Sequence, residues 1–231
     1  MMQRRTSAVG CMTSAQNWTR PSSIRHVTQN DASCSPSSGA GETIPSPMDA
    51  PMRIKATADA KDIRDVDLVM IWTDTNNTRK AAEYAASMLS PNGFAITLQN
   101  GIGNIEMLVD VLGSERVVAG SSMCSAATAG LGDARFTHRG MTSIGELDGQ
   151  ESTRITHLAQ ALRNAGFEVD IRADILSLVW TKFALNCSIN ALCAVTGLRL
   201  GELARVPATN AFQDGIIDEI LKVIAARGIT L

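Results

Sequence analysis

The sequence predicts an α/β protein, with a partial, doubly wound parallel sheet followed by an all-helical C-terminal region that is itself incomplete. Two segments, residues 66–73 and 93–100, have the continuous hydrophobicity of strands that are covered on both faces. Each is followed by a helical pattern, and such alternation with short links is typical of a doubly wound sheet. After residue 171 no strand pattern recurs. We therefore expect residues 51–172 to form the α/β domain and residues 173–231 a helical domain.

The elements are expected in the following order along the chain. Strands are predicted at 66–73, 93–100, from 116 onward and at 167–171, a hairpin at 132–147, and helices at 78–90, 103–111, 152–165, 174–196 and 209–227. The helix at 174–196 begins after Asp174 and ends at Gly197, and it is apolar nearly all round, as a buried helix is. The last helix has one apolar stripe that needs a covering partner, formed by Phe212, Ile216, Ile217, Ile220, Leu221 and Ile224.

Residues 1–50 differ in composition from the rest of the chain. They are rich in Ser, Thr, Pro, Gly and Asn and show neither helical nor strand periodicity. We expect them to be a disordered or atypical extension that adds no strand to the sheet. The first thirty residues contain four arginines and no acidic residue, which superficially resembles an organelle transit peptide. A disordered extension is the preferred interpretation.

Bulk properties exclude several classes of function. A net charge of −2 and a pI near 5.9 leave no basic surface for nucleic acid. No apolar segment is expected to span a membrane, because charged residues such as Lys182 interrupt the longest ones. The five cysteines include no CxxC and the three histidines have no ligand spacing, so no metal site is predicted. Free thiols fit a reducing, cytoplasmic setting.

Three polar side chains interrupt the apolar helix in "VWTKFALNCSIN", residues 179–190. Lys182, Asn186 and Asn190 are four apart, and at about 100° per residue they lie along one helical face. Lysine is almost never fully buried without a partner, and buried amides need hydrogen bonds. The three residues therefore indicate a polar ligand or a cleft that admits one. The alternative is a solvent channel or a domain contact without chemistry.

A second informative segment is "TLQNGIGN", residues 97–104, where the predicted strand ends and two glycines precede a helix. Ligands of open α/β sheets bind at the carboxyl ends of strands. Glycine lets the backbone approach a ligand there, and the first N–H groups of a helix favour an anion. A glycine turn selected for geometry alone is the alternative. A GxGxxG motif is absent, because the third position is Glu106.

Together, "LQNGIGN", "WTKFALNCSIN" and "GELARV" resemble the ketopantoate reductase (2-dehydropantoate 2-reductase) family from about residue 65 to residue 231. The resemblance implies a Rossmann-like domain that binds NADPH and a helical domain, like that of 6-phosphogluconate dehydrogenase, that closes over a 2-oxo acid. It implies that Lys182 is the general acid and that Asn186 and Asn190 bind the substrate. It also implies that Asn100, Gly101 and the backbone of Ala126 contact the cofactor.

The resemblance also shows where the chain departs from the family. The GxGxxG turn is absent, Asp74 stands where the family has a cofactor-binding lysine, and a serine and a glutamate would come from helices beyond residue 231. We therefore expect both domains to be incomplete, with weak NADPH binding and little turnover. The expected function is reduction of ketopantoate to pantoate in pantothenate biosynthesis. The alternatives are an inactive remnant of the family and a reductase of another small 2-oxo acid. The helical stripe offers a surface for a homodimer.

Overall fold

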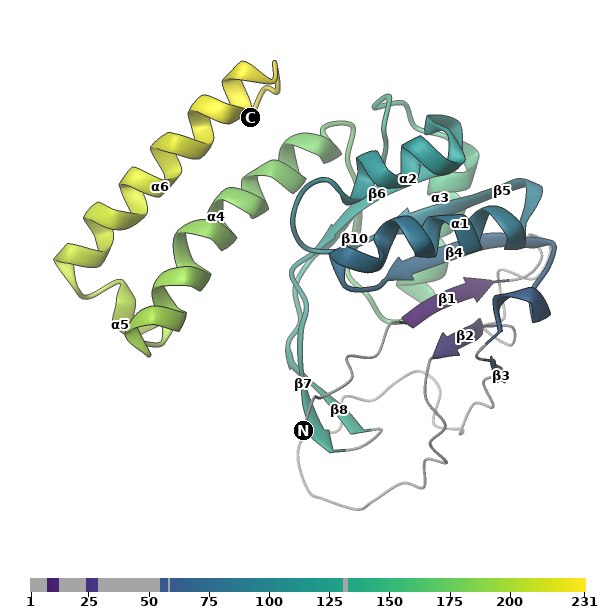
Figure 1. Ribbon diagram of the computed structural model, residues 1–231, viewed down its shortest axis with the longest axis horizontal. Helices are drawn as coiled ribbons and strands as arrows, with labels where there is room; N and C mark the ends of the chain where they lie inside the picture. Colours follow the sequence, from purple (N-terminus) through teal and green to yellow (C-terminus); the bar gives the residue numbers. More distant parts are fainter. Residues whose placement is uncertain (1–7, 13–23, 29–54, 58, 131–132) are drawn as a thin grey trace.

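The computed structural model describes residues 8–12, 24–28, 55–57, 59–130 and 133–231, and its main feature is an eight-stranded sheet (Figure 1). The strand order is β10-β9-β6-β5-β4-β1-β2-β3. These strands are β1 (Ala8–Met12), β2 (Ile24–Thr28), β3 (Lys55–Thr57), β4 (Val66–Trp72), β5 (Leu89–Thr97), β6 (Val117–Ser122), β9 (Thr142–Glu146) and β10 (Val169–Ile171). The central strands β4, β5 and β6 are parallel, so their carboxyl ends share one edge.

Helices cover both faces of the central strands, as the sequence predicts. The helices are α1 (Thr78–Met88), α2 (Asn104–Leu112) and α3 (Thr153–Asn164), and short 3₁₀ turns lie at Ala60–Asp62, Thr75–Asn77 and Ser114–Arg116. Alternate side chains of β4 point to opposite faces. Val69 and Ile71 share a core with α1 and α2, whereas Leu68 and Met70 share a second core with α3. The doubly wound α/β class is therefore confirmed.

The N-terminal part of the sheet differs from the expectation for residues 1–50. β1 pairs antiparallel with β4 and with β2, so the prediction of no strand from this segment is wrong. β4 would otherwise present an unpaired edge, and such an edge is a template for any short strand-forming segment. "AVGCM" and "IRHVT" are two such segments, hidden in the average composition of the fifty residues. The remaining residues of 1–50 lie outside the described part of the chain.

The predicted hairpin at 132–147 is also wrong in its pairing. β7 (Ser125–Gly130) pairs with β8 (Asp133–His138) in a separate two-stranded sheet, and β9 leaves that ribbon to pair antiparallel with β6. All five residues of β9 are buried between β6 and β10. The free energy gained by burying β9 in the main sheet is larger than that of pairing it with β8, its neighbour in sequence.

The helical region consists of α4 (Ile175–Thr196), α5 (Leu200–Leu203) and α6 (Pro207–Ala226), and Figure 1 shows α4 and α6 side by side, extending away from the sheet. The expectation of a fully buried α4 is wrong. Its buried residues form one stripe, whereas Val195 is 86% exposed and Leu185 is 45% exposed. The predicted stripe on α6 is also only partly covered, since Ile224 is buried and Phe212 is 68% exposed.

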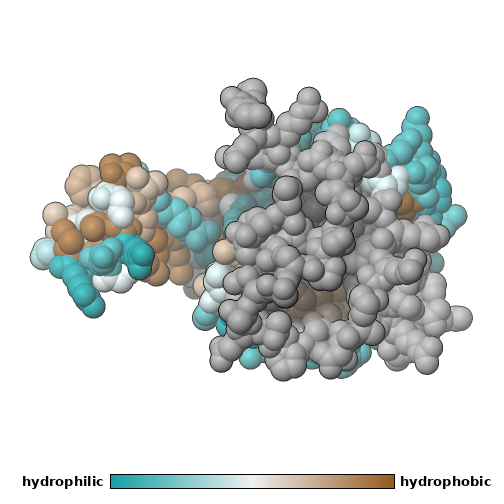
Figure 2. Space-filling view, turned by 90° about the horizontal axis from the view of Figure 1, so that it is seen from below, coloured by the Kyte–Doolittle hydropathy of each residue, from teal (hydrophilic) through white to brown (hydrophobic). Residues whose placement is uncertain are grey.

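α4 bears on the expectation that no apolar segment spans a membrane. By length and composition alone, Ile175–Thr196 is one described helix that is apolar enough to cross a bilayer. The same properties are found in core helices of soluble proteins, and here α4 contacts β6, β9 and α6. Figure 2 shows apolar surface on this protruding region. A homodimer that covers this surface stays a prediction.

Candidate active site

The turn after β5 is the first part of the candidate site. Gly101 and Gly103 adopt the left-handed conformation, with φ of 90° and 88°, and no atom lies within 4 Å of a Cβ placed on either. The backbone conformation therefore requires glycine here, and the space around both residues is open. The first N–H groups of any helix lack an intrahelical partner, and in α2 the N-cap residue Gly103 has no side chain to accept from them.

A network of buried amides and hydroxyls fixes this turn. The amide of Gln99 donates to the carbonyl of Thr73 at 2.6 Å and to Thr78 Oγ1 at 2.9 Å, which ties the end of β5 to the end of β4. Thr78 donates in turn to Asn104 Oδ1 at 2.9 Å, and Asn104 donates to the carbonyl of Asn100 at 3.2 Å. Sequence reasoning missed Thr78 and Asn104. Their signal was a polar residue at the start of each of two amphipathic helices.

A shallow cavity of about 330 Å³ opens at this point. Its lining comes from the ends of β4 and β5: Trp72, Thr73, Asp74, Thr75, Leu98, Gln99 and Asn100. Asn100 and Asp74 are both exposed. The cavity therefore presents a neutral amide and a carboxylate to any ligand that enters it.

Lys182 lies at the same edge of the sheet, one strand further along. Its Nζ donates a hydrogen bond to the carbonyl of Ser122, the last residue of β6. Burial lowers the pKa of Lys182, and the nearby Cys124 acts in the opposite direction. An ammonium has three donors, so this contact leaves two for a ligand.

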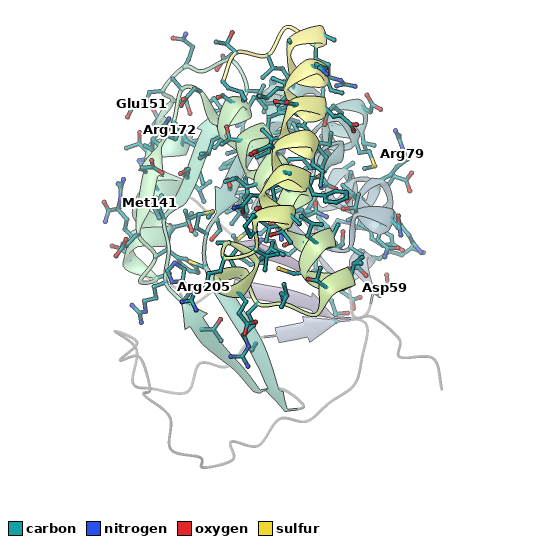
Figure 3. The ribbon with its side chains drawn as sticks, turned by 90° about the vertical axis from the view of Figure 1, so that its left-hand side faces the viewer. Asp59, Arg79, Met141, Glu151, Arg172 and Arg205 are labelled. Atoms are coloured by element: carbon teal, nitrogen blue, oxygen red, sulfur yellow. The ribbon has the colours of Figure 1, made fainter. Side chains whose placement is uncertain are left out.

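The glycine turn and the lysine helix meet in a second cavity of about 160 Å³. Gly101, Ile102 and Gly103 line one side, and Leu176, Val179 and Trp180 of α4 line another. Arg227 closes this cavity: its guanidinium lies 5.8 Å from the ring centre of Trp180 and 3.9 Å from Glu106. Figure 3, seen from the helical side, shows α6 lying across α4.

The other predicted site residues are less enclosed. Asn186 is half-buried and Asn190 is exposed, one and two turns beyond Lys182. Within the described part of the chain neither amide makes a side-chain hydrogen bond, so both are free to bind. Ala126 is exposed on β7, where it pairs with Phe136 beyond the end of β6. The structure thus brings Lys182 to the sheet edge that bears Asn100 and Gly101, and it places Ala126 outside the main sheet.

Cys124 provides a test of the electrostatics around Lys182. Burial acts to raise the pKa of the Cys124 thiol, but hydrogen bonds with Ser122, Gly140 and Thr142 outweigh it and the net pKa is lowered. Because the thiolate raises the Lys182 pKa, Cys124→Ser should lower that pKa further. The measurement is the pH dependence of Lys182 acylation, followed by peptide mass spectrometry. An unchanged or upward-shifted profile would contradict this electrostatic coupling.

The fold and the site together define a doubly wound α/β protein with a helical region whose polar groups gather at the carboxyl edge of the sheet, where ligands of this class bind. Residues 8–149 match the family described as ketopantoate reductase PanE/ApbA, and residues 174–231 match its C-terminal domain. The chain belongs to the ketopantoate reductase family.

Individual relatives agree with this assignment. A 2-dehydropantoate 2-reductase of Halobacterium salinarum is 28% identical over 179 residues, which cover 78% of this chain and 59% of the relative. One from Archaeoglobus fulgidus is 29% identical over 71% of this chain and 54% of its own length. The chain therefore spans little more than half the length of these relatives.

Solved structures show the same partial coverage. A PanE/ApbA family ketopantoate reductase from Ralstonia eutropha matches with a TM-score of 0.69 and 28% identity, over 80% of this chain and 60% of that one. D-mandelate dehydrogenase in complex with NADH and anilino(oxo)acetate matches with a TM-score of 0.70 and 22% identity, over 80% and 59%. At that identity the second likeness concerns the fold alone.

Proposed function

We propose that this chain reduces a 2-oxo acid with a nicotinamide cofactor, and that the reaction is conversion of 2-dehydropantoate to pantoate with NADPH. Membership of a family of metabolic reductases supports the class of reaction and a cytoplasmic location. The observation that carries the proposal is the half-buried ammonium of Lys182 at the carboxyl edge of the sheet. The general acid of a carbonyl reduction needs this position and this partial desolvation.

The residues at the sheet edge fit one end of a dinucleotide better than the other. The open space at Gly101 and the amide of Asn100 suit a flat, neutral ring such as nicotinamide. The carboxylate of Asp74, in contrast, lines the neighbouring cavity and repels phosphate. We therefore propose that Asn100 and Gly101 hold the nicotinamide end, with Ala126 contacting the cofactor, and that overall affinity is low.

The mechanism follows from the groups at this edge. A nicotinamide cofactor held at this edge would supply hydride, and negative charge would then develop on the oxygen of the substrate carbonyl. The carbonyl of Ser122 holds one donor of Lys182, and the remaining donors are directed to that oxygen, stabilise its charge and then transfer a proton. Asn186 and Asn190, being neutral, bind polar substrate groups without raising the pKa of Lys182, as a carboxylate in their place would.

The proposed reaction is tested by assaying NADPH and NADH oxidation by the purified chain with ketopantoate and with phenylglyoxylate. We expect ketopantoate with NADPH to give the highest kcat/KM. Faster turnover of phenylglyoxylate than of ketopantoate would show that the preferred substrate is another 2-oxo acid. Failure of the chain to oxidise either cofactor with any 2-oxo acid would overturn the proposal.

The role of Asp74 predicts a gain of affinity. Reversing its charge with Asp74→Lys should tighten NADPH binding at least a few-fold, because one charge reversal at a partly screened site contributes on the order of 1 kcal/mol or more. Fluorescence titration of NADPH measures the Kd. Asp218→Lys, the same change on the exposed part of α6, is the matched control and should leave the Kd unchanged. Equal effects of the two variants would remove Asp74 from the phosphate site.

A further inference from the structure

A series of hydrogen bonds joins the end of β6 to the start of β9. The residues that form them are not among those predicted for the site. Ser122 and Thr142 are directly paired across these antiparallel strands, and their hydroxyl oxygens are 2.9 Å apart. Thr142 is 1% exposed, and its backbone N–H donates to the carbonyl of Glu168 at 2.8 Å. The hydroxyl of Thr142 is therefore buried, and that of Ser122, which is half-buried, lies against it.

The residues that follow Ser122 are fixed by the same pair of segments. The N–H of Cys124 donates to Ser122 Oγ at 3.3 Å, and its thiol donates to the carbonyl of Gly140 at 3.2 Å. Met123 N–H donates to the carbonyl of Met141 at 2.9 Å. A Cβ at Gly140 would lie 2.7 Å from Met123, so the two segments approach as closely as glycine permits. Met141 is labelled in Figure 3.

This arrangement sets the direction of one backbone carbonyl. The carbonyl of Ser122 accepts the hydrogen bond from Lys182, across sixty residues of sequence. The Met123 N–H lies in the same peptide unit as this carbonyl, and its hydrogen bond to the carbonyl of Met141 holds the peptide. The Ser122–Thr142 hydroxyl pair and the hydrogen bond from Cys124 N–H to Ser122 Oγ restrict its remaining rotation. The Thr142 hydroxyl is thus one of the groups that steady the acceptor of Lys182, and among the described residues it makes no hydrogen bond with Lys182 itself.

We propose that Thr142, acting through the Ser122 hydroxyl, is a positioning residue that fixes the carbonyl to which Lys182 binds and so directs the ammonium toward the substrate. This inference rests on the proposed function only in naming a substrate as the group toward which the ammonium points. The placement of Lys182 by Thr142 is a property of the fold and is measurable without turnover.

The test replaces Thr142 with valine, which keeps the β-branched shape and removes the hydroxyl. The first readout is the pH profile of Lys182 acylation. A carbonyl acceptor favours the charged form, so its loss in Thr142→Val should lower the pKa of Lys182 and move the profile to lower pH. The second readout is kcat, which should fall about tenfold with KM unchanged, since a displacement of roughly 1 Å costs on the order of 10²-fold and a smaller one less.

Two further variants separate positioning from general damage. Thr142→Ser restores the hydroxyl and should restore both readouts. Ser143→Ala, the adjacent buried residue whose side chain points to the other face of β9, should change neither. A profile in Thr142→Val identical to that of the wild type, or an equal shift in Ser143→Ala, would overturn the inference. If the profile responds as expected but no variant and no wild type reduces a 2-oxo acid, the proposed function fails and the positioning role stands.

Discussion

Replacing Lys182 with methionine is expected to slow the reduction of ketopantoate by about 10²–10⁴-fold, to the background of the assay. The change removes the proton donor and the partner of the developing oxyanion together. These effects are worth roughly 10²–10⁴-fold and 10²–10³-fold separately, and they do not add when one residue supplies both. NADPH oxidation with saturating ketopantoate measures the loss. Lys222→Met, which removes an exposed ammonium from α6, is the matched control and should leave the rate unchanged.

Unfolding of the Lys182→Met variant does not explain its expected loss of activity. The pKa of Lys182 is lower in the folded chain than in the unfolded one, because burial disfavours the charged form. At pH values below the folded pKa the ammonium therefore costs stability, and this cost disappears as the pH rises through 10.5. At neutral pH the Lys182→Met variant should unfold at a urea concentration no lower than the wild type. Equal residual turnover in the variant and the wild type would exclude Lys182 as the proton donor.

Replacing Glu146 with alanine is expected to destabilise the fold by about 3–5 kcal/mol, the cost typical of breaking a buried ion pair from one side. Glu146 is 6% exposed and accepts two hydrogen bonds from Arg154, at 2.8 and 2.5 Å. It also accepts one from Ser152, the N-cap of α3, at 2.5 Å. The substitution thus leaves a partly buried guanidinium without its carboxylate and loosens the start of α3.

Urea unfolding followed by circular dichroism measures this loss. Glu151→Ala is the matched control, because Glu151 is exposed (Figure 3) and its removal should change stability by no more than about 0.5 kcal/mol. The Arg154→Met variant and the double variant complete a thermodynamic cycle, and they should show strong coupling between the two residues. A loss in Glu146→Ala no larger than in Glu151→Ala would show that the pair does not anchor α3.

The elements that the sequence predicted well are those whose signal is local. β4, α3 and α4 have periodicities and end signals within their own residues, and the turn at Gly101 follows from glycine spacing alone. The placement of β9 between β6 and β10 depends on pairing with residues far away in sequence, which no local pattern encodes. The strands within residues 1–50 were missed for the same reason, because the edge of β4 selects them.

The candidate site shows the same division. Spacing places Lys182, Asn186 and Asn190 on one face of one helix, and their polarity indicates a ligand or a cleft there. The acceptor of Lys182 was not predictable, because it is a backbone carbonyl on another element and has no side-chain identity to read. The expected burial of α4 was wrong because hydrophobic composition reports what a helix can bury, and the neighbours present in this chain cover only one stripe.

The most direct test of the central claim traces the transferred hydride with an isotope label, without relying on the absorbance of NADPH. The chain is incubated with ketopantoate and with NADPH that carries deuterium at the transferable position of the nicotinamide, and the 2-hydroxy acid is analysed by mass spectrometry. We expect singly deuterated pantoate from the wild type even if turnover is slow, and at least about 10²-fold less of it from Lys182→Met in the same time. Absence of labelled product from the wild type under conditions where NADPH binding is measured, or equal labelling by both proteins, would contradict it.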